Sequence, residues 1–136
     1  MNYIQKIELE FCTVSLREDG ILEHRFVRNT PYEIDARHMA EITEAMTILA
    51  KGQPRPILSI AGLYGSMTPE ARKVDIHAGD HYTLALGLVI RELAQRLLAN
   101  FYFKIKKVDY PIKTFRSEEE AVAWLQQQIR SNQMVG

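Results

Sequence analysis

The stretch PILSIAGLYGSMTPEAR, residues 56–72, contains the end of one structural element and the beginning of the next. It opens with Pro56 to Ile60, an apolar run that is too short for a helix and suits a strand buried on both faces. Thr68 can cap a helix, Pro69 suits the first helical position, and Glu70 favours the positive end of the helix. A buried strand followed by a helix is typical of a parallel sheet with crossover helices, so the stretch predicts an α/β fold.

A hairpin and a helix are predicted on the amino-terminal side of this stretch. Apolar residues from Ile4 to Leu16 fit one half-buried strand, an Asp-Gly turn follows at 18–20, and a second strand covers 21–27. Asp35 can cap a helix whose apolar positions step by three and four residues until Lys51-Gly52. The hairpin is expected to supply the one antiparallel pairing of the sheet.

Strands and helices continue to alternate on the carboxy-terminal side. The second helix is expected to run from Thr68 to near Gly79. The remaining predicted elements are a strand at 82–88, an apolar helix at 91–103, a strand at 110–115, and a helix at 117–129 that a capping box opens. The order ββαβαβαβα predicts an α/β fold with a mostly parallel mixed sheet, an N-terminal β-hairpin and packed helices.

Composition places the chain among ordinary globular domains. It has 136 residues, of which 46% are hydrophobic and 25% charged, so a single domain over 1–136 is expected. Seventeen basic and seventeen acidic residues give zero net charge, which argues against a nucleic-acid binder. The polar N-terminus and the lack of an apolar run of about 20 residues predict a cytoplasmic protein without an integral membrane segment. The single cysteine, Cys12, is expected to be a buried hydrophobe.

Three segments carry a resemblance to a known family: residues 56–72, residues 96–103, and residues 110–125. The order of the predicted elements and the amino acids in these segments resemble those of the STAS-like, or SpoIIAA-like (anti-sigma-factor-antagonist-like), domains, closest to small uncharacterised bacterial members. The resemblance covers nearly the whole chain and implies a compact sheet with helices packed on it and no enzyme activity. It also implies that the loop from Gly62 to Thr68 lies at the carboxyl edge of the sheet, where α/β folds place ligands. The phosphorylated stretch of the antagonist branch corresponds here to Ser66–Glu70.

A binding site is predicted where the third strand passes into the second helix. Free backbone N–H groups and hydroxyls at a helix start favour an anion or an acidic partner side chain, although tight turns also need glycine. The candidate binding residues are Gly62, Tyr64, Gly65, Ser66, Thr68 and Arg72. The favoured function is a non-enzymatic interaction module that binds a protein partner or itself, as a homodimer, through Leu63–Lys73. The alternative is a small-molecule or lipid carrier (Sec14-like) that holds an apolar ligand under helices such as 91–103.

Other groups of residues indicate a functional site only weakly, and we expect no catalytic residue, cofactor or metal. His77 and His81 lie four apart beside Asp80, but Gly79 breaks the helix that a zinc pair needs. The serines and histidines lack a nucleophile elbow. Lysines alternate with aromatic residues over 103–115, a pattern that fits either a solvated edge or contact with RNA or an acidic membrane surface.

Overall fold

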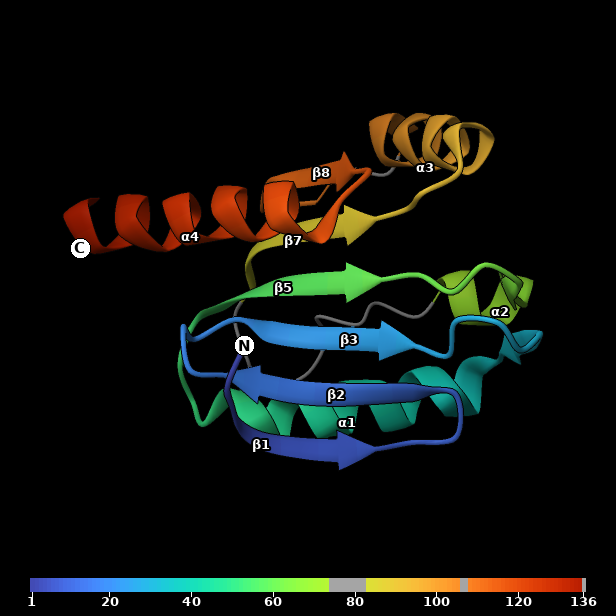
Figure 1. Ribbon diagram of the computed structural model, residues 1–136, viewed down its shortest axis with the longest axis horizontal. Helices are drawn as coiled ribbons and strands as arrows, with labels where there is room; N and C mark the ends of the chain where they lie inside the picture. The colour runs from blue at the N-terminus through green and yellow to red at the C-terminus, as the bar shows by residue number, and fades with distance from the viewer. Residues whose placement is uncertain (74–82, 106–107, 136) are drawn as a thin grey trace.

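The computed structural model describes residues 1–73, 83–105 and 108–135. These residues form an α/β fold with a six-stranded mixed sheet in the order β1-β2-β3-β5-β7-β8 (Figure 1). The strands are β1 (Tyr3–Glu8), β2 (Cys12–Arg17), β3 (Leu22–Phe26), β5 (Arg55–Ile60), β7 (Thr83–Val89) and β8 (Ile112–Phe115). The four strands from β3 to β8 pair in parallel, which confirms the predicted mostly parallel sheet.

The amino-terminal strands differ from the prediction. The segment expected to be one strand from Ile4 to Leu16 forms two strands, β1 and β2, which pair antiparallel. Because β2 also pairs antiparallel with β3, the sheet has two antiparallel pairings where one was predicted. The Asp-Gly turn is confirmed between β2 and β3, where Gly20 has φ +90. Leu9, whose N–H donates to the Cys12 carbonyl at 2.8 Å, closes the additional turn.

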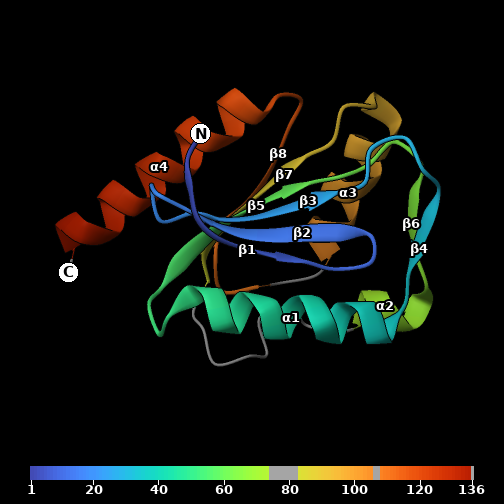
Figure 2. The same ribbon diagram turned by 60° about the horizontal axis from the view of Figure 1, so that its bottom comes forward.

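Two helices cover opposite faces of the sheet (Figure 2). Helix α1 (Ala36–Ala50) begins at the predicted cap, where the Asp35 carboxylate accepts from the His38 N–H at 2.9 Å. It ends at Lys51, which has φ 56, so the predicted stop at Lys51-Gly52 is confirmed. Helix α4 (Glu118–Val135) packs on β5 and β7 on the other face. The buried side chains divide accordingly into one core beneath α1 and a second beneath α4.

A small second sheet stands at one end of the main sheet (Figure 2). It consists of β4 (Tyr32–Ile34) and β6 (Gly65–Met67), which pair in parallel. Strand β6 lies inside the segment predicted as a loop, so that prediction was wrong over Gly65–Met67. Helix α2 follows as Pro69–Lys73, and the rest of the predicted second helix, up to Gly79, lies outside the described residues.

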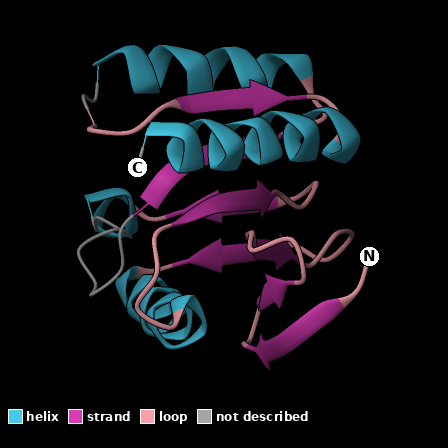
Figure 3. Ribbon diagram, turned by 90° about the vertical axis from the view of Figure 1, so that its left-hand side faces the viewer, coloured by secondary structure: helices cyan, strands magenta, loops and turns pink. Residues whose placement is uncertain are grey.

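Helix α3 (Leu93–Ile105) is the outermost element at the end of the molecule opposite β1 (Figures 1 and 3). It packs mainly along β8, where the Thr114 hydroxyl donates to the Asn100 side-chain carbonyl at 2.9 Å. In the described parts of the chain, no helix is both long enough and apolar enough to cross a membrane.

Candidate ligand-binding cavity

The predicted binding loop is built around the ring of Tyr32. The Gly62 N–H donates to the Tyr32 hydroxyl oxygen at 3.1 Å. A Cβ at Gly65 would overlap Cζ and Oη of Tyr32, and a Cβ at Gly62 would overlap the Val27 carbonyl oxygen. Both glycines are therefore required by the close approach of the backbone to its neighbours and not by a left-handed turn conformation, since Gly65 lies in strand β6.

The other predicted site residues have different surroundings. The Ser66 hydroxyl donates to the Tyr32 carbonyl at 3.4 Å, and Thr68 Oγ1 accepts from the Ala71 N–H at 3.1 Å as a helix cap. Tyr64 is 59% exposed. Arg72 lines a cavity behind the loop. Most of the predicted binding residues therefore have packing or helix-capping roles in the described structure. Of the six, Arg72 is the one that lines this cavity.

That cavity has a volume of about 590 Å³ and lies between the sheet, α1, α2 and α3. Its walls come from every layer on that side of the molecule. The lining residues are His24, Phe26, Met39, Ile42, Ser59, Met67, Ala71, Arg72, Leu86, Leu88, Leu98, Ala99, Tyr102, Phe103, Val108 and Tyr110. Most of them are apolar or aromatic, as is usual for small-molecule sites.

A few polar groups interrupt the apolar lining. His24 on β3 and Ser59 on β5 are partners in the parallel register, and both lie on the floor of the cavity. Arg72 enters from α2, and the Tyr102 hydroxyl from α3 donates to the Arg72 carbonyl at 3.4 Å. An apolar space with a small number of polar groups can hold a ligand that has an apolar body and one polar end.

Helix α3 forms one wall of the cavity but buries little of its own surface. Its least exposed residues, Arg96, Ala99 and Phe103, are all only partly buried, and Ala99 and Phe103 face the cavity. Five large apolar side chains of α3 are 59–70% exposed, and one of them, Leu98, also lines the cavity: Leu93, Leu97, Leu98, Phe101 and Ile105. The apolar stripe that the sequence predicts is therefore present, yet it does not pack into the core.

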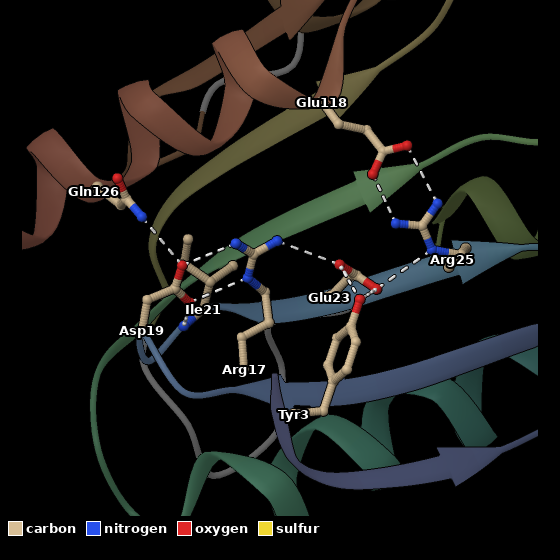
Figure 4. Close-up of polar contacts among 8 residues, drawn as sticks. All are labelled: Tyr3, Arg17, Asp19, Ile21, Glu23, Arg25, Glu118 and Gln126. Carbon is tan, nitrogen blue, oxygen red and sulfur yellow. Dashed lines mark hydrogen bonds and ion pairs between the residues drawn. The ribbon is translucent and has the colours of Figure 1, made fainter. Parts of the chain in front are cut away.

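Ion pairs on the opposite face of the sheet fasten the first strands to α4 (Figure 4). The guanidinium of buried Arg17 donates hydrogen bonds to both carboxylate oxygens of Asp19, at 3.1 and 2.9 Å, and forms an ion pair with Glu23 at 3.4 Å. Arg25 donates to both oxygens of Glu118, at 3.2 and 2.7 Å. These hydrogen bonds lower the pKa of the Glu118 carboxyl and raise the pKa of the Arg25 guanidinium. The network connects β2 and β3 with the start of α4.

A second hollow of about 450 Å³ lies at the carboxyl ends of β3, β5 and β7. Arg25, Arg28 and Arg91 line it together with Glu118. Glu118 pairs with Arg25 and lies 3.9 Å from Arg91, and Glu8 also lines the hollow, so two carboxylates offset part of the charge of the three arginines. This hollow is therefore a weaker candidate for ligand binding than the apolar cavity.

The remaining candidate residues supply no reactive group among the described residues. Cys12 is 4% exposed, as predicted, and burial raises the pKa of its thiol to about 12, which disfavours the reactive thiolate. No group of three or more His, Cys, Asp or Glu within residues 1–73, 83–105 and 108–135 is arranged to hold a metal ion. His77 and His81 lie outside the described residues.

Sequence reasoning missed most of the cavity walls. Tyr32, which explains the two loop glycines, stands in a three-residue strand without a periodic pattern. Met39 and Ile42 on α1 and Leu86 on β7 carry the signal of core residues, which is the same for a side chain that lines a cavity. The one useful signal in the sequence is the strongly apolar helix at 91–103, on which the alternative prediction of an apolar ligand beneath it depends.

Fold and cavity together define an α/β domain with an open, mostly apolar cavity on one side of its sheet. The chain belongs to a family described as a domain of unknown function, DUF7793, whose family model matches residues 15–129. The matched range runs from β2 into α4 and includes every element that lines the cavity. No curated protein and no solved structure matches the chain.

Proposed function

We propose that this protein is a non-enzymatic binding domain that holds one small molecule with an apolar body and a polar end in the cavity between the sheet and α3. The observation that carries the proposal is the cavity itself, with its volume of about 590 Å³ and its apolar lining. Ligand sites in proteins usually have volumes of about 300–1,000 Å³, and most of their lining is apolar. The cavity therefore has the size and chemistry of a site for a single small ligand.

The polar groups indicate an amphiphile as the class of ligand. His24 and Ser59 are polar residues at the floor, while Arg72 contributes a positive charge on the α2 side. A chain or ring system packed against Leu86, Leu88 and α3, with an acidic or hydroxyl end near these groups, satisfies both parts of the lining. A fatty-acid-like single-chain carboxylate is the simplest probe of this class.

We also propose that the domain is of the STAS-like type that its sequence resembles. Helices alternate with the parallel strands β3, β5, β7 and β8, which are neighbours in the sheet in chain order. This order supports the proposal, together with the resemblance in residues 56–72, 96–103 and 110–125. It also agrees with a role in binding, because the resemblance implies no catalytic motif.

Isothermal titration of the full chain with decanoate and dodecanoate tests the binding function. Burying a methylene group contributes about 0.8 kcal/mol, and dodecanoate has two more than decanoate, so we expect it to bind about 15-fold more tightly. Ala99 is partly buried and lines the cavity, and Ala99→Trp is expected to weaken binding at least tenfold by filling it. The matched control is Ala94→Trp, at an exposed position of the same helix, and it should leave the affinity unchanged.

Two results would contradict the proposal. Binding that is equally strong in both tryptophan variants would place the ligand elsewhere on the surface. A wild-type chain that binds neither carboxylate, and that shows no retained ligand in native mass spectrometry after purification, would remove the small-molecule function altogether.

A protein partner, or a second copy of this chain, is the second candidate, as expected for the segment Leu63–Lys73. The exposure of Tyr64, 59%, next to Met67, 36%, favours contact at that segment. Sedimentation velocity measures it: a dimer in the wild type that Tyr64→Ser dissociates supports this candidate, and a monomer at high micromolar concentration excludes self-association.

A further inference from the structure

The lining of the apolar cavity divides into a buried floor and an exposed mouth. On the sheet, His24 of β3 and Leu86 of β7 are buried and form part of the floor. Leu98 and Tyr102 from α3 belong to the same lining, yet both are exposed. Arg72 is exposed as well and comes from α2. The mouth of the cavity therefore lies between α2 and α3.

Arg72 gives this mouth a positive charge. The described residues that line the cavity include one arginine, Arg72, and no Lys, Asp or Glu. Within residues 1–73, 83–105 and 108–135, no carboxylate forms an ion pair with Arg72. In the second hollow, by contrast, Arg25 is already paired with Glu118. The charge at the mouth is therefore not offset by a described carboxylate.

We propose that Arg72 selects the ligand by its charge. The cavity takes an amphiphile with an anionic head, and this head stays at the mouth beside Arg72 while the apolar chain extends to the floor. A guanidinium donates parallel hydrogen bonds to a carboxylate or a phosphate, so it recognises this class of head group directly. The inference rests on the proposed function and adds to it the charge and the orientation of the ligand.

The opposite orientation of the ligand is unfavourable. An ionised head at the floor, beside buried Leu86, would lose its hydration, and the described floor contains no Lys or Arg to compensate for that loss. At the mouth the head keeps part of its water and also meets Arg72. The apolar chain gains free energy by leaving water for contact with Leu86 and Leu88. Both ends of the ligand thus favour the same orientation.

The experiment is isothermal titration of the full chain at neutral pH with decanoate, decanol and decylammonium, which share one alkyl chain. We expect decanoate to bind most tightly and decylammonium least. Arg72→Gln should weaken decanoate binding about fivefold, as for an ion pair at an exposed site, and leave decanol binding unchanged. The matched control is Lys73→Gln, which removes the neighbouring exposed charge of α2, outside the described lining, and should change neither.

Two further measurements complete the test. Arg72→Lys keeps the charge and should keep the preference for decanoate over decylammonium. Higher salt should weaken the binding of decanoate and not that of decanol. The urea midpoint of each variant shows whether the fold is intact.

The outcomes separate this inference from the proposed function. Equal affinity of the wild type for decanoate and decylammonium would overturn the role of Arg72, and so would an equal loss of decanoate binding in Arg72→Gln and Lys73→Gln. If Ala99→Trp still weakens the binding of decanol in that case, the cavity remains the ligand site. If the wild type binds none of the ligands, the proposed function and the role of Arg72 are both wrong.

Discussion

Adding one methyl group at Gly65 tests how the predicted loop is held. In Gly65→Ala the new Cβ would overlap Cζ and Oη of Tyr32 and approach Cε2 to 2.6 Å. The Tyr32 ring has little room to move, because it stacks on Phe26 at 5.5 Å and on Phe11 at 5.8 Å between ring centroids. Relief of the overlap must therefore disturb these stacks or separate β6 from β4.

The expected cost follows from two opposing effects. Replacing glycine by alanine stabilises a protein by about 0.4–1 kcal/mol where the backbone tolerates it, because the unfolded chain loses freedom. Overpacking costs about 1–3 kcal/mol, and each disturbed aromatic pair contributes about 0.5–1.5 kcal/mol. We expect the free energy of unfolding of Gly65→Ala to fall by about 2 kcal/mol, which shifts the urea midpoint by roughly 1 M.

A double-mutant cycle with Tyr32→Leu isolates the cause. Without the ring, Gly65→Ala should be neutral or slightly stabilising, so the two substitutions should couple by more than about 1.5 kcal/mol. Gly52→Ala is the control, since its Cβ would meet nothing within 4 Å and its cost comes from φ +72. That cost should be the same with and without Tyr32. A coupling at Gly65 below about 0.5 kcal/mol would refute the argument that the ring dictates glycine there.

Three further outcomes are expected. Thr68→Ala should lower the free energy of unfolding by about 1 kcal/mol by removing the hydroxyl that accepts from the Ala71 N–H, and Thr68→Ser should retain it in urea titrations. Arg25 holds the pKa of Glu118 below its ordinary value of 4.5, so the stabilisation by this pair is present above that value and is lost as the pH falls through the folded pKa. Glu118→Gln should therefore cost up to about 1 kcal/mol at pH 7 and flatten the acid limb of a stability profile, unlike Glu119→Gln at the same helix end. The Cys12 thiol, whose pKa burial raises to about 12, should resist dithionitrobenzoate in the native protein at pH 8 and react in urea; rapid native reaction would contradict its burial.

Local signals in the sequence were sufficient for most of the α/β framework. The cap at Asp35, the left-handed stop at Lys51, the Asp-Gly turn and the cap at Thr68 each depend on side-chain and backbone chemistry within a few residues. Ser117, whose hydroxyl accepts from the Glu120 N–H at 3.2 Å, is a further example. Such interactions require no knowledge of the tertiary fold, and the predicted starts and stops at these positions are confirmed.

Short elements that depend on distant partners were not predictable in this way. Strand β4 has three residues and pairs with β6 across a gap that contains α1 and β5, so neither strand has a local pattern of its own. The break between β1 and β2 lies in a run of apolar residues without a turn motif, where the Leu9 N–H donates to the Cys12 carbonyl and the Phe11 carbonyl accepts from the Val27 N–H. Pairing across such distances is decided by tertiary contacts, which outweigh weak β-propensity.

The apolar helix α3 shows why a pattern can be correct and still leave the function open. The periodicity of apolar residues predicts which side chains share a face of a helix, but it does not predict whether that face packs on the sheet or is exposed to solvent. In α1 the stripe through Met39, Ile42 and Met46 is buried, whereas in α3 the stripe through Leu97 and Phe101 is exposed. The orientation depends on how α3 packs along β8, and this contact leaves the apolar side outward and a cavity on the inner side. A helix with apolar residues on both sides needs a partner for each, and the proposed amphiphile covers the inner side.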